Sequence, residues 1–335
     1  MTHDASLSHR PHRLPADAWH RVMTLRELHA HGVSAAEARR RSAPGGDWQQ
    51  PAPGVFLLHG TAPRGEELLL AARRYAEAEG GTGGPGSGEH AALLTGMSAL
   101  ALYGFRSAPR PALLERADLL VPHDSRLAAA DRVGVTHCGR LPRPVTVDGF
   151  ALAPTAWAVA DAVAPPTDPA VVREVLVEAV TSGRCDAAAV VRELGRARLR
   201  ALPHVDAAIG AMVAAGRRVA EDRLLALVRD GGLPDPLWNV RLRLPGGPQL
   251  GAVDAYWPDH AVAVRLDTRT ARRDAAVERV ARERRETLER LGVAVVSMTP
   301  RQVAEEPGLR ASMVRTALLA ATTRPPAAYV TVLPR

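Results

Sequence analysis

Aromatic side chains make up only 4% of the 335 residues, and this scarcity constrains the fold more than any other property of the chain. Hydrophobic cores must then be built mainly from Leu, Val and Ala. A chain of this length exceeds what one ordinary core covers and suits two or three small domains. Hydrophobic residues make up 46% and charged residues 24%, which is typical of a soluble globular protein.

Signals for membrane insertion, secretion and disulfide bonding are missing from the sequence. The longest apolar runs are far shorter than the ~20 residues of a membrane span. The N-terminus lacks the apolar segment of a secretory signal. Cys138 and Cys185 are too few for a disulfide framework or a zinc site. We therefore expect a cytoplasmic protein without a membrane partner.

All 43 basic residues are arginine, and the formal net charge is +7. Without lysine, the chain has no side-chain amine for a Schiff base, for general-base catalysis or for clamping a phosphate. Guanidinium groups bind phosphate through two parallel hydrogen bonds, so this charge suits a nucleic-acid partner.

Two helix starts follow residues 1–21, which we expect to form a disordered tail. Thr24 with Glu27, and Ser34 with Glu37, have the spacing of a capping box. A glycine between them ends the first helix. Two short helices joined by a tight turn are typical of a helix-turn-helix.

A strand hairpin is predicted next, because turn residues 44–47 and Pro53-Gly54 punctuate two short strand patterns. The two helices and this hairpin together predict a winged helix-turn-helix over residues 22–62. Three adjacent arginines cover about 200° of a helix, so they cannot all face the interior. We expect DNA contact, and a solvated helix face is the alternative. The candidate DNA-binding residues are Ser34, Arg39, Arg40, Arg41, Trp48 and Gln50.

Residues 63–155 are predicted to form a mixed α/β middle domain, and residues 156–215 a helical linker. The glycine-rich run 80–88 cannot bury a core and is expected to be a flexible loop. We find no catalytic constellation between residues 105 and 215. The expected helices are 65–79 and about 90–103, and the expected strands are 118–121, 133–137 and 145–152.

Residues 216–322 are predicted to form a C-terminal domain of helices and strands, followed by a loosely ordered tail over 323–335. Hydrophobic periodicity alternates between the helical and the strand form along this region. The predicted elements are a helix (218–230), three strands (238–244, 250–257 and 260–267), a helix (about 272–291), a strand (293–298) and a helix (300–321).

Acidic residues in this domain have the arrangement of a site. Glu221 shares a helix face with Leu224, Leu225 and Val228, so its carboxylate is expected to point inward, where it needs a partner. Asp254 lies late in the second strand, with its two neighbours on the other face. In the third strand, Val262, Val264 and Leu266 share one face. Arg265 and Asp267 are expected on the opposite face, near Asp254. Three acids and one arginine are expected to converge: Glu221, Asp254, Arg265 and Asp267.

The C-terminal pattern resembles the very-short-patch-repair-like branch of the PD-(D/E)xK nucleases. The resemblance rests on the acidic helix, the hairpin ending in Val253-Asp254 and Pro258, and the segments Arg284–Gly292 and Val293–Val303. It implies a restriction-endonuclease-like α/β/α fold. Active members hold Mg²⁺ between acidic groups so that the metal activates water.

The N-terminal part is similar to AbiEi-like antitoxins, which begin with a winged helix. This resemblance rests on the paired helices after Thr24 and on Leu94–Gly104, Val147–Phe150 and Pro154–Ala156. Together the two resemblances cover residues from about 22 to 320 and imply a DNA-associated protein.

Three departures from the nuclease pattern imply that the site does not cut. Arg265 stands where these nucleases carry a metal-binding glutamate, and a guanidinium repels a divalent cation. Thr268 replaces a glycine, and residues 269–273 contain no histidine. We therefore expect no metal and no cofactor. We expect instead an ion pair of Arg265 with Asp254 or Glu221 in the place of the metal.

The leading interpretation is a DNA-binding regulatory protein of the antitoxin or transcriptional-regulator type, with an inactive nuclease-like domain. A metal-dependent endonuclease using Glu221, Asp254 and Asp267 would need Mg²⁺. A third interpretation is an adaptor that binds a protein such as a cognate toxin. The arginine-rich segment 269–290 suits either contact with a DNA backbone or a salt-bridged surface helix.

Overall fold

The computed structural model describes residues 21–79, 92–268, 275–321 and 330–334. Helices and three β-sheets confirm the expected α+β composition. Two compact units result, residues 1–178 with 196–199 and residues 179–195 with 200–335. Residues 1–20 of the tail predicted over 1–21 and the glycine-rich loop lie outside the described residues. None of the described helices combines the length and the apolar character needed to cross a bilayer.

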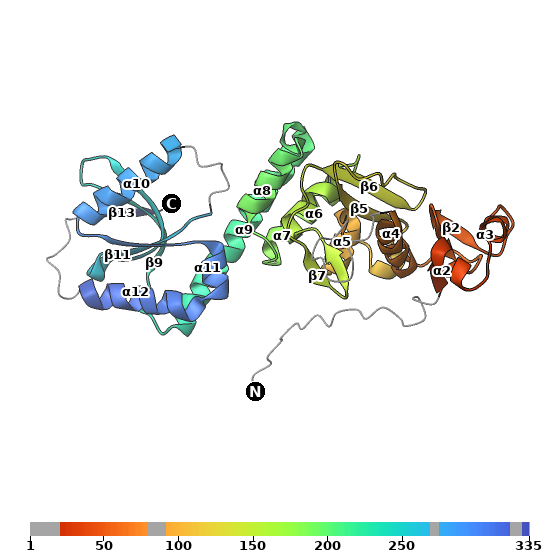
Figure 1. Ribbon diagram of the computed structural model, residues 1–335. Coiled ribbons are helices and arrows are strands. Elements are labelled where there is room, and N and C mark those ends of the chain that lie inside the picture. The colour runs from red at the N-terminus through yellow and green to blue at the C-terminus, as the bar shows by residue number, and fades with distance from the viewer. Residues whose placement is uncertain (1–20, 80–91, 269–274, 322–329, 335) are drawn as a thin grey trace. The chain divides into compact units, whose positions relative to one another are not determined.

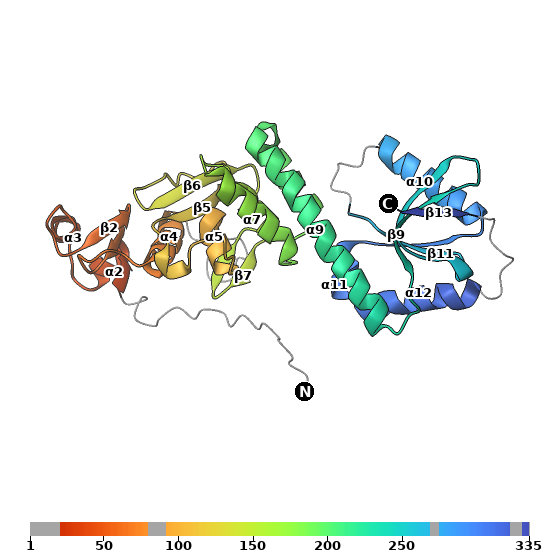
Figure 2. The same cartoon turned by 180° about the vertical axis from the view of Figure 1, so that it is seen from behind.

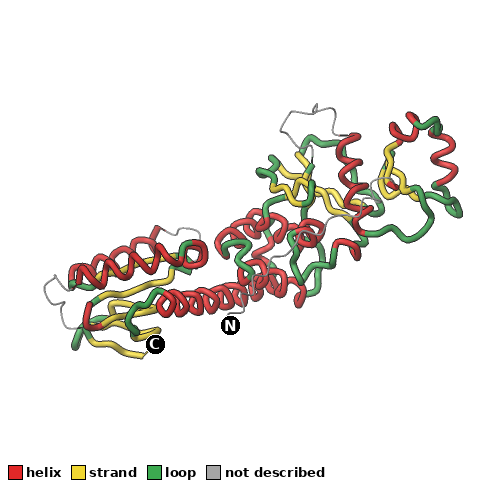
Figure 3. The backbone as a smooth tube through the Cα atoms, turned by 90° about the horizontal axis from the view of Figure 1, so that it is seen from below, coloured by secondary structure: helices red, strands yellow, loops and turns green. Residues whose placement is uncertain are grey.

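A three-stranded antiparallel sheet begins the first unit, with strand order β1-β3-β2. Two short helices lie beside these strands (Figure 3). Leu28, Ala38 and Phe56 form the buried core that joins helices and strands. The elements of this N-terminal segment are β1 (Val22–Thr24), α2 (Leu25–Ala30), α3 (Ala35–Arg41), β2 (Gln49–Ala52) and β3 (Val55–Leu57).

Of the two capping boxes predicted in this segment, one is complete and the other is only partly formed. Thr24 and Glu27 form the complete capping box that their spacing predicts. Ser34 accepts a hydrogen bond from the Glu37 amide at 3.2 Å. The Glu37 carboxylate, however, binds arginines of its own helix, so the second box is present only on the serine side.

The rest of the first unit is built on a five-stranded sheet with order β6-β5-β4-β8-β7. Asp148 and Gly149 turn the β7–β8 hairpin, and both have a positive φ, 49° and 79°. The elements are α4 (Gly65–Glu79), β4 (Leu93–Leu94), α5 (Gly96–Leu102), η1 (Pro111–Leu113), β5 (Ala117–Pro122), β6 (Val133–Cys138), β7 (Val145–Val147), β8 (Phe150–Leu152) and α6 (Thr155–Ala162).

The helix predicted over 90–103 starts later than expected. Leu93 and Leu94 form the central strand β4, which pairs with both β5 and β8, and α5 begins only at Gly96. A two-residue apolar strand cannot be distinguished from the start of a buried helix by periodicity alone.

Helices follow the second sheet, as predicted for this stretch of chain. One of them, α9, is a single helix from Pro203 to Asp230 (Figure 2). The boundary expected between residues 215 and 216 therefore falls inside α9. The preceding elements are α7 (Pro169–Thr181), α8 (Ala187–Arg196) and η2 (Leu199–Ala201).

The second unit contains a five-stranded mixed sheet with order β12-β11-β10-β9-β13. Strands β11 and β12 are parallel, and the other neighbours are antiparallel. Its elements after α9 are β9 (Leu237–Arg243), β10 (Gln249–Trp257), η3 (Pro258–His260), β11 (Val262–Leu266), α10 (Ala275–Arg290), β12 (Ala294–Met298), α11 (Pro300–Glu305), α12 (Pro307–Ala321) and β13 (Thr331–Pro334).

Helices cover both faces of this sheet (Figure 1). Helices α9, α11 and α12 pack on one face through Leu224, Val303 and Val314, against Val262 and Val264 of β11. Helix α10 packs on the other face through Leu288. The predicted sandwich of helices around a sheet is therefore present in this unit.

Two predictions for the end of the chain are wrong. The helix expected over 300–321 is divided at Glu306 into α11 and α12. Residues 331–334, expected in a loose tail, form β13 and pair with β9. The alternation of a four-residue strand next to a proline-rich stretch is too short to be read from sequence.

Candidate functional site

Helix α3 carries the three arginines that are predicted from the sequence to contact DNA. Ala38 is fully buried and fixes the helix on the core of the N-terminal segment. Arg39 and Arg40 lie on the exposed side, and the Arg40 side chain is 76% exposed. One side of the helix therefore packs on the core, and the other side presents guanidinium groups to solvent.

Arg40 and Arg41 both pair with Glu37, but Arg41 differs from its two neighbours because it also contacts the hairpin that follows the helix. Its Nε donates to Glu37 Oε1 at 2.8 Å, and its guanidinium carbon lies 4.8 Å from the centroid of the Trp48 ring. The Trp48 amide also donates to the Arg41 carbonyl at 3.0 Å. Arg41 thus links α3 to the start of the β2–β3 hairpin.

Glu37 is the acid closest to these arginines along the helix. Hydrogen bonds from Arg41 and Arg40 lower the pKa of Glu37 below its ordinary value. Ser34 and Gln50, the other candidates, are exposed, whereas Trp48 is half-buried against the core. The candidates lie on α3, just before it and on the adjoining hairpin.

In the second unit, one arginine bridges two of the predicted acids. Arg217 Nε donates to Glu221 Oε1 at 2.7 Å, and Arg217 Nη2 donates to Asp254 Oδ1 at 2.6 Å. The Asp254 side chain is 5% exposed, and those of Arg217 and Glu221 are each about one quarter exposed. A buried carboxylate is thereby paired with a cation from α9.

The second oxygen of Asp254 also has a partner. Asp254 Oδ2 accepts a hydrogen bond from the Leu266 amide at 2.6 Å. The β10–β11 pairing ends at Ala255 and Val264. Beyond this last pair, the Leu266 amide hydrogen-bonds to the Asp254 carboxylate in place of a backbone carbonyl of β10. The carboxylate thus stabilises the point where the two strands separate.

The neighbours of Asp254 do not share one face, contrary to expectation. Val253 packs in the cluster under α10, and Ala255 packs in the cluster under α9. The facing strand is irregular at the same level, where Asn239 has a φ of 51°. A break in the pleat at this level changes which face each side chain takes, and a strict period of two cannot predict it.

The cation predicted between the acids was Arg265, whereas the structure shows Arg217 in contact with both Glu221 and Asp254. Val264 and Leu266 belong to the cluster on the α9 face of the sheet. Alternation along β11 directs Arg265 toward the α10 face, together with Ala263. Glu221 lies on α9, on the other side of the sheet.

The face of α9 that carries Glu221 also differs from the prediction. Leu225, expected inside, is 47% exposed, whereas Ala220, Leu224, Leu227 and Val228 are buried. Glu221 therefore lies at the margin of the apolar stripe. Asp267, the fourth predicted residue, follows β11, and its amide donates to the Met298 carbonyl at 2.9 Å.

These residues do not fit the divalent metal that the nuclease resemblance implies. The Arg217 guanidinium contacts both Glu221 and Asp254, so a cation supplied by the chain already occupies the position between them. Within the described ranges, no group of three or more His, Cys, Asp and Glu side chains is arranged to hold a metal.

The first unit contains a separate buried polar cluster. Thr95 Oγ1 donates to Asp161 Oδ2 at 2.7 Å, and burial raises the pKa of Asp161. Arg196 Nη2 lies 3.8 Å from Asp161 Oδ1, and its guanidinium carbon lies 3.4 Å from the Trp157 ring centroid. These contacts tie α6 to the residues after β4.

The sequence does not single out Arg217, although one signal was available. Arg217 and Glu221 have the i, i+4 spacing that places side chains on one side of a helix. Their link to Asp254 depends on how α9 packs on the sheet, which no local pattern indicates.

Compared with known proteins, the chain matches no protein-family model and no curated protein sequence. The expected relationships to antitoxins and nucleases therefore depend on the motifs themselves. The geometry of the described residues is what bears on function.

Proposed function

We propose that the protein is a DNA-binding regulatory protein of the antitoxin or transcriptional-regulator type. In this proposal the N-terminal segment is a winged helix-turn-helix, and α3 is the helix that contacts DNA. The second unit is a nuclease-like domain that does not cut.

The exposure of Arg39 and Arg40 above the buried Ala38 carries this proposal. A DNA-reading helix must be fixed on its domain and must present charged or polar side chains outward. Ser34 and Gln50 are exposed close to α3 and add polar groups for phosphate contacts. The formal net charge of +7 favours association with a polyanion.

The contacts of Arg217 disfavour the alternative of a metal-dependent endonuclease. A metal between Glu221 and Asp254 would have to displace a guanidinium that is hydrogen-bonded to both. We therefore expect no cleavage of plasmid DNA with Mg²⁺ or Mn²⁺. Nicking by the wild type that Asp254→Asn abolishes would contradict this part of the proposal.

Fluorescence anisotropy of a labelled duplex, recorded at several salt concentrations, tests DNA binding. We expect the affinity to fall steeply with salt, because each phosphate contact releases a counterion. The double variant Arg39→Gln, Arg40→Gln should bind more weakly. Its slope of log affinity against log salt should be smaller by about 2 if each arginine contacts one phosphate.

The matched control is the double variant Arg218→Gln, Arg229→Gln. It removes the same charge from exposed positions on α9. We expect it to bind as the wild type does. Equal weakening by both double variants would show that binding depends on overall charge, and the absence of binding by the wild type would favour the adaptor interpretation.

A further inference from the structure

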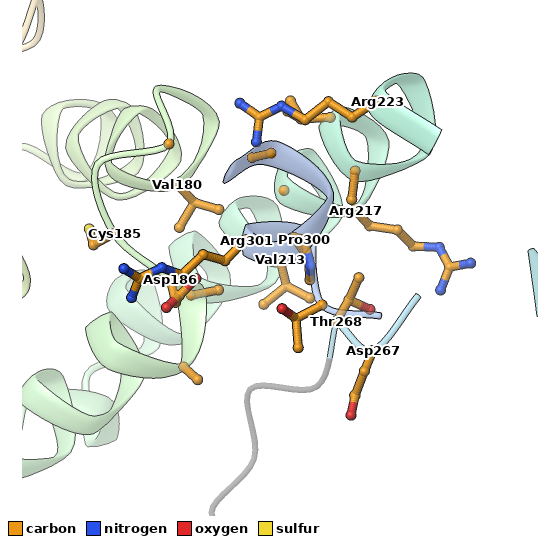
Figure 4. Close-up of a pocket in the computed structure, with 18 of the residues that line it drawn as sticks. Val180, Cys185, Asp186, Val213, Arg217, Arg223, Asp267, Thr268, Pro300 and Arg301 are labelled. Atoms are coloured by element: carbon orange, nitrogen blue, oxygen red, sulfur yellow. The ribbon is translucent and has the colours of Figure 1, made fainter. Parts of the chain in front are cut away.

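A cavity of about 370 Å³ lies within the second unit (Figure 4). Its walls come from the loop between α7 and α8, from α9, from the residues after β11, and from α11. All of its lining residues belong to this one unit. The volume is in the range that accommodates small organic ligands.

Small apolar residues form part of the cavity lining. Val213 and Ala220 of α9 line it, together with Val180 at the end of α7. At Gly216 the two helices approach closely, since a Cβ there would lie 2.7 Å from Val180 Cγ1. Glycine at this position therefore permits the close packing at the edge of the cavity.

Charged residues also line the cavity, and most of them have partners of opposite charge or other interactions. Arg217 binds Glu221 and Asp254, and Figure 4 shows it directed away from the other arginines. Arg301 Nε donates to Glu305 Oε1 at 2.8 Å. Glu305 and the nearby Asp186 both raise the pKa of Arg301. Arg184 and Asp267 each have interaction partners of their own.

Arg223 is the exception among these cations. It is half-buried at the edge of the cavity, and Nη2 lies 3.5 Å from the position that a Cβ of Gly183 would occupy. Among the described residues, no carboxylate lies within ion-pair distance of its guanidinium. A partly desolvated cation without an acid next to a cavity favours an anionic ligand.

We propose that this cavity binds a small amphipathic organic anion, a carboxylate or phosphate monoester with an apolar body, whose anionic group is held by Arg223. The apolar body packs against Val180, Val213 and Ala220. Burial raises the pKa of the Cys185 thiol in the lining to about 12, which disfavours the reactive thiolate, and the proposed ligand is held by non-covalent contacts. This site is independent of the DNA-binding proposal.

Isothermal titration calorimetry on the full chain tests the proposal with probes that differ only in their head group. Octanoate and octyl phosphate carry the anionic groups, octan-1-ol is neutral, and octylammonium is cationic. Inorganic phosphate supplies the anion without an apolar body. We expect one molecule of octanoate or octyl phosphate to bind per chain, with much weaker binding of the other three probes.

Two variants locate the binding to this cavity. Arg223→Gln should weaken binding of the anionic probe by about tenfold or more, as expected for the loss of a hydrogen bond to a charged group. Ala188→Trp should block the cavity, because Ala188 is exposed and lines it. Arg218→Gln, a neighbouring exposed arginine outside the lining, is the matched control and should bind as the wild type does.

The comparison between octanoate and octyl phosphate identifies which head group the site prefers. The proposal is overturned if neither anionic probe binds, if octylammonium binds as tightly, or if Arg223→Gln and Arg218→Gln behave alike. If Ala188→Trp does not fold, as judged by circular dichroism, the head-group series and Arg223→Gln still decide the outcome.

Discussion

Two arginine–glutamate pairs with the same helical spacing occur in different settings. On α3, Arg41 Nε lies 2.8 Å from Glu37, and on α9, Arg217 Nε lies 2.7 Å from Glu221. Both glutamate side chains are 27% exposed. The difference lies in the third group of each pair. On α3, Glu37 also binds Arg40, whose side chain is 76% exposed. On α9, by contrast, Arg217 also reaches Asp254, whose side chain is 5% exposed.

The comparison shows that neither the helical spacing nor the N–O distance determines how much an ion pair contributes to stability. An exposed pair is screened by solvent and adds little to stability. A cation bound to a buried carboxylate cannot be removed alone, because the remaining charge loses its compensation. On α3 the paired guanidinium groups remain accessible to solvent, whereas on α9 Arg217 occupies the position between Glu221 and Asp254 at which the nuclease resemblance implies a metal.

The largest effect is expected for Arg217→Ala. This change removes the Arg217 guanidinium from the buried Asp254 carboxylate, so the free energy of unfolding of the second unit should fall by about 3–5 kcal/mol. Urea denaturation measures the loss. Hydrogen exchange of the Leu266 amide, which donates to Asp254, should accelerate as well.

Arg218→Ala is the control for this prediction, since Arg218 is the exposed neighbour on the same helix. It should change the free energy of unfolding by no more than about 0.5 kcal/mol. If both variants lose the same stability, the bridge to Asp254 is not what distinguishes the two pairs.

A smaller effect is expected for Glu37→Gln. This substitution removes a negative charge beside the proposed DNA contacts and releases Arg40 and Arg41. Affinity for duplex DNA should increase by about two- to fivefold at low salt, and the increase should diminish as salt rises. Anisotropy titrations measure it, and unchanged or weaker binding would show that Glu37 positions these arginines productively.

The smallest effect concerns the titration of Glu37 itself. Because Arg41 and Arg40 lower its pKa in the folded state, Glu37 contributes stability above its ordinary pKa of 4.5. That contribution is lost as the pH falls through the lowered pKa. A carboxyl titration followed by NMR should give a midpoint below 4.5, and Arg41→Gln should raise it more than Arg40→Gln. A wild-type midpoint at or above 4.5 would refute the assignment.

Much of the secondary structure could be predicted because it depends on local patterns. The strands near 238–244 and 250–257 lie within one residue of β9 and β10 at each end, since alternating side chains and turn residues mark their bounds. The short strand β4 was mistaken for helix because two leucines carry no periodicity. The terminal strand β13 has too few residues to stand out.

The candidate site was predicted less completely than the fold. Glu221 and Asp254 do lie together, but the arginine between them comes from a different element than expected. The irregular pleat at Asn239 and Asp254 redirects side chains in a way that strand periodicity does not encode. The cavity next to Arg223 depends on packing between distant segments, and no local sequence pattern reports an unfilled space.

Strand β13 makes completion of the sheet in the second unit a late event during synthesis. Residues 331–334 leave the ribosome more than 80 residues after the strand β9 that they cover. Until then, β9 has an uncovered edge that another chain could pair with. Arg241 and Arg243 on β9 place charge along this edge, which discourages such pairing while translation is in progress.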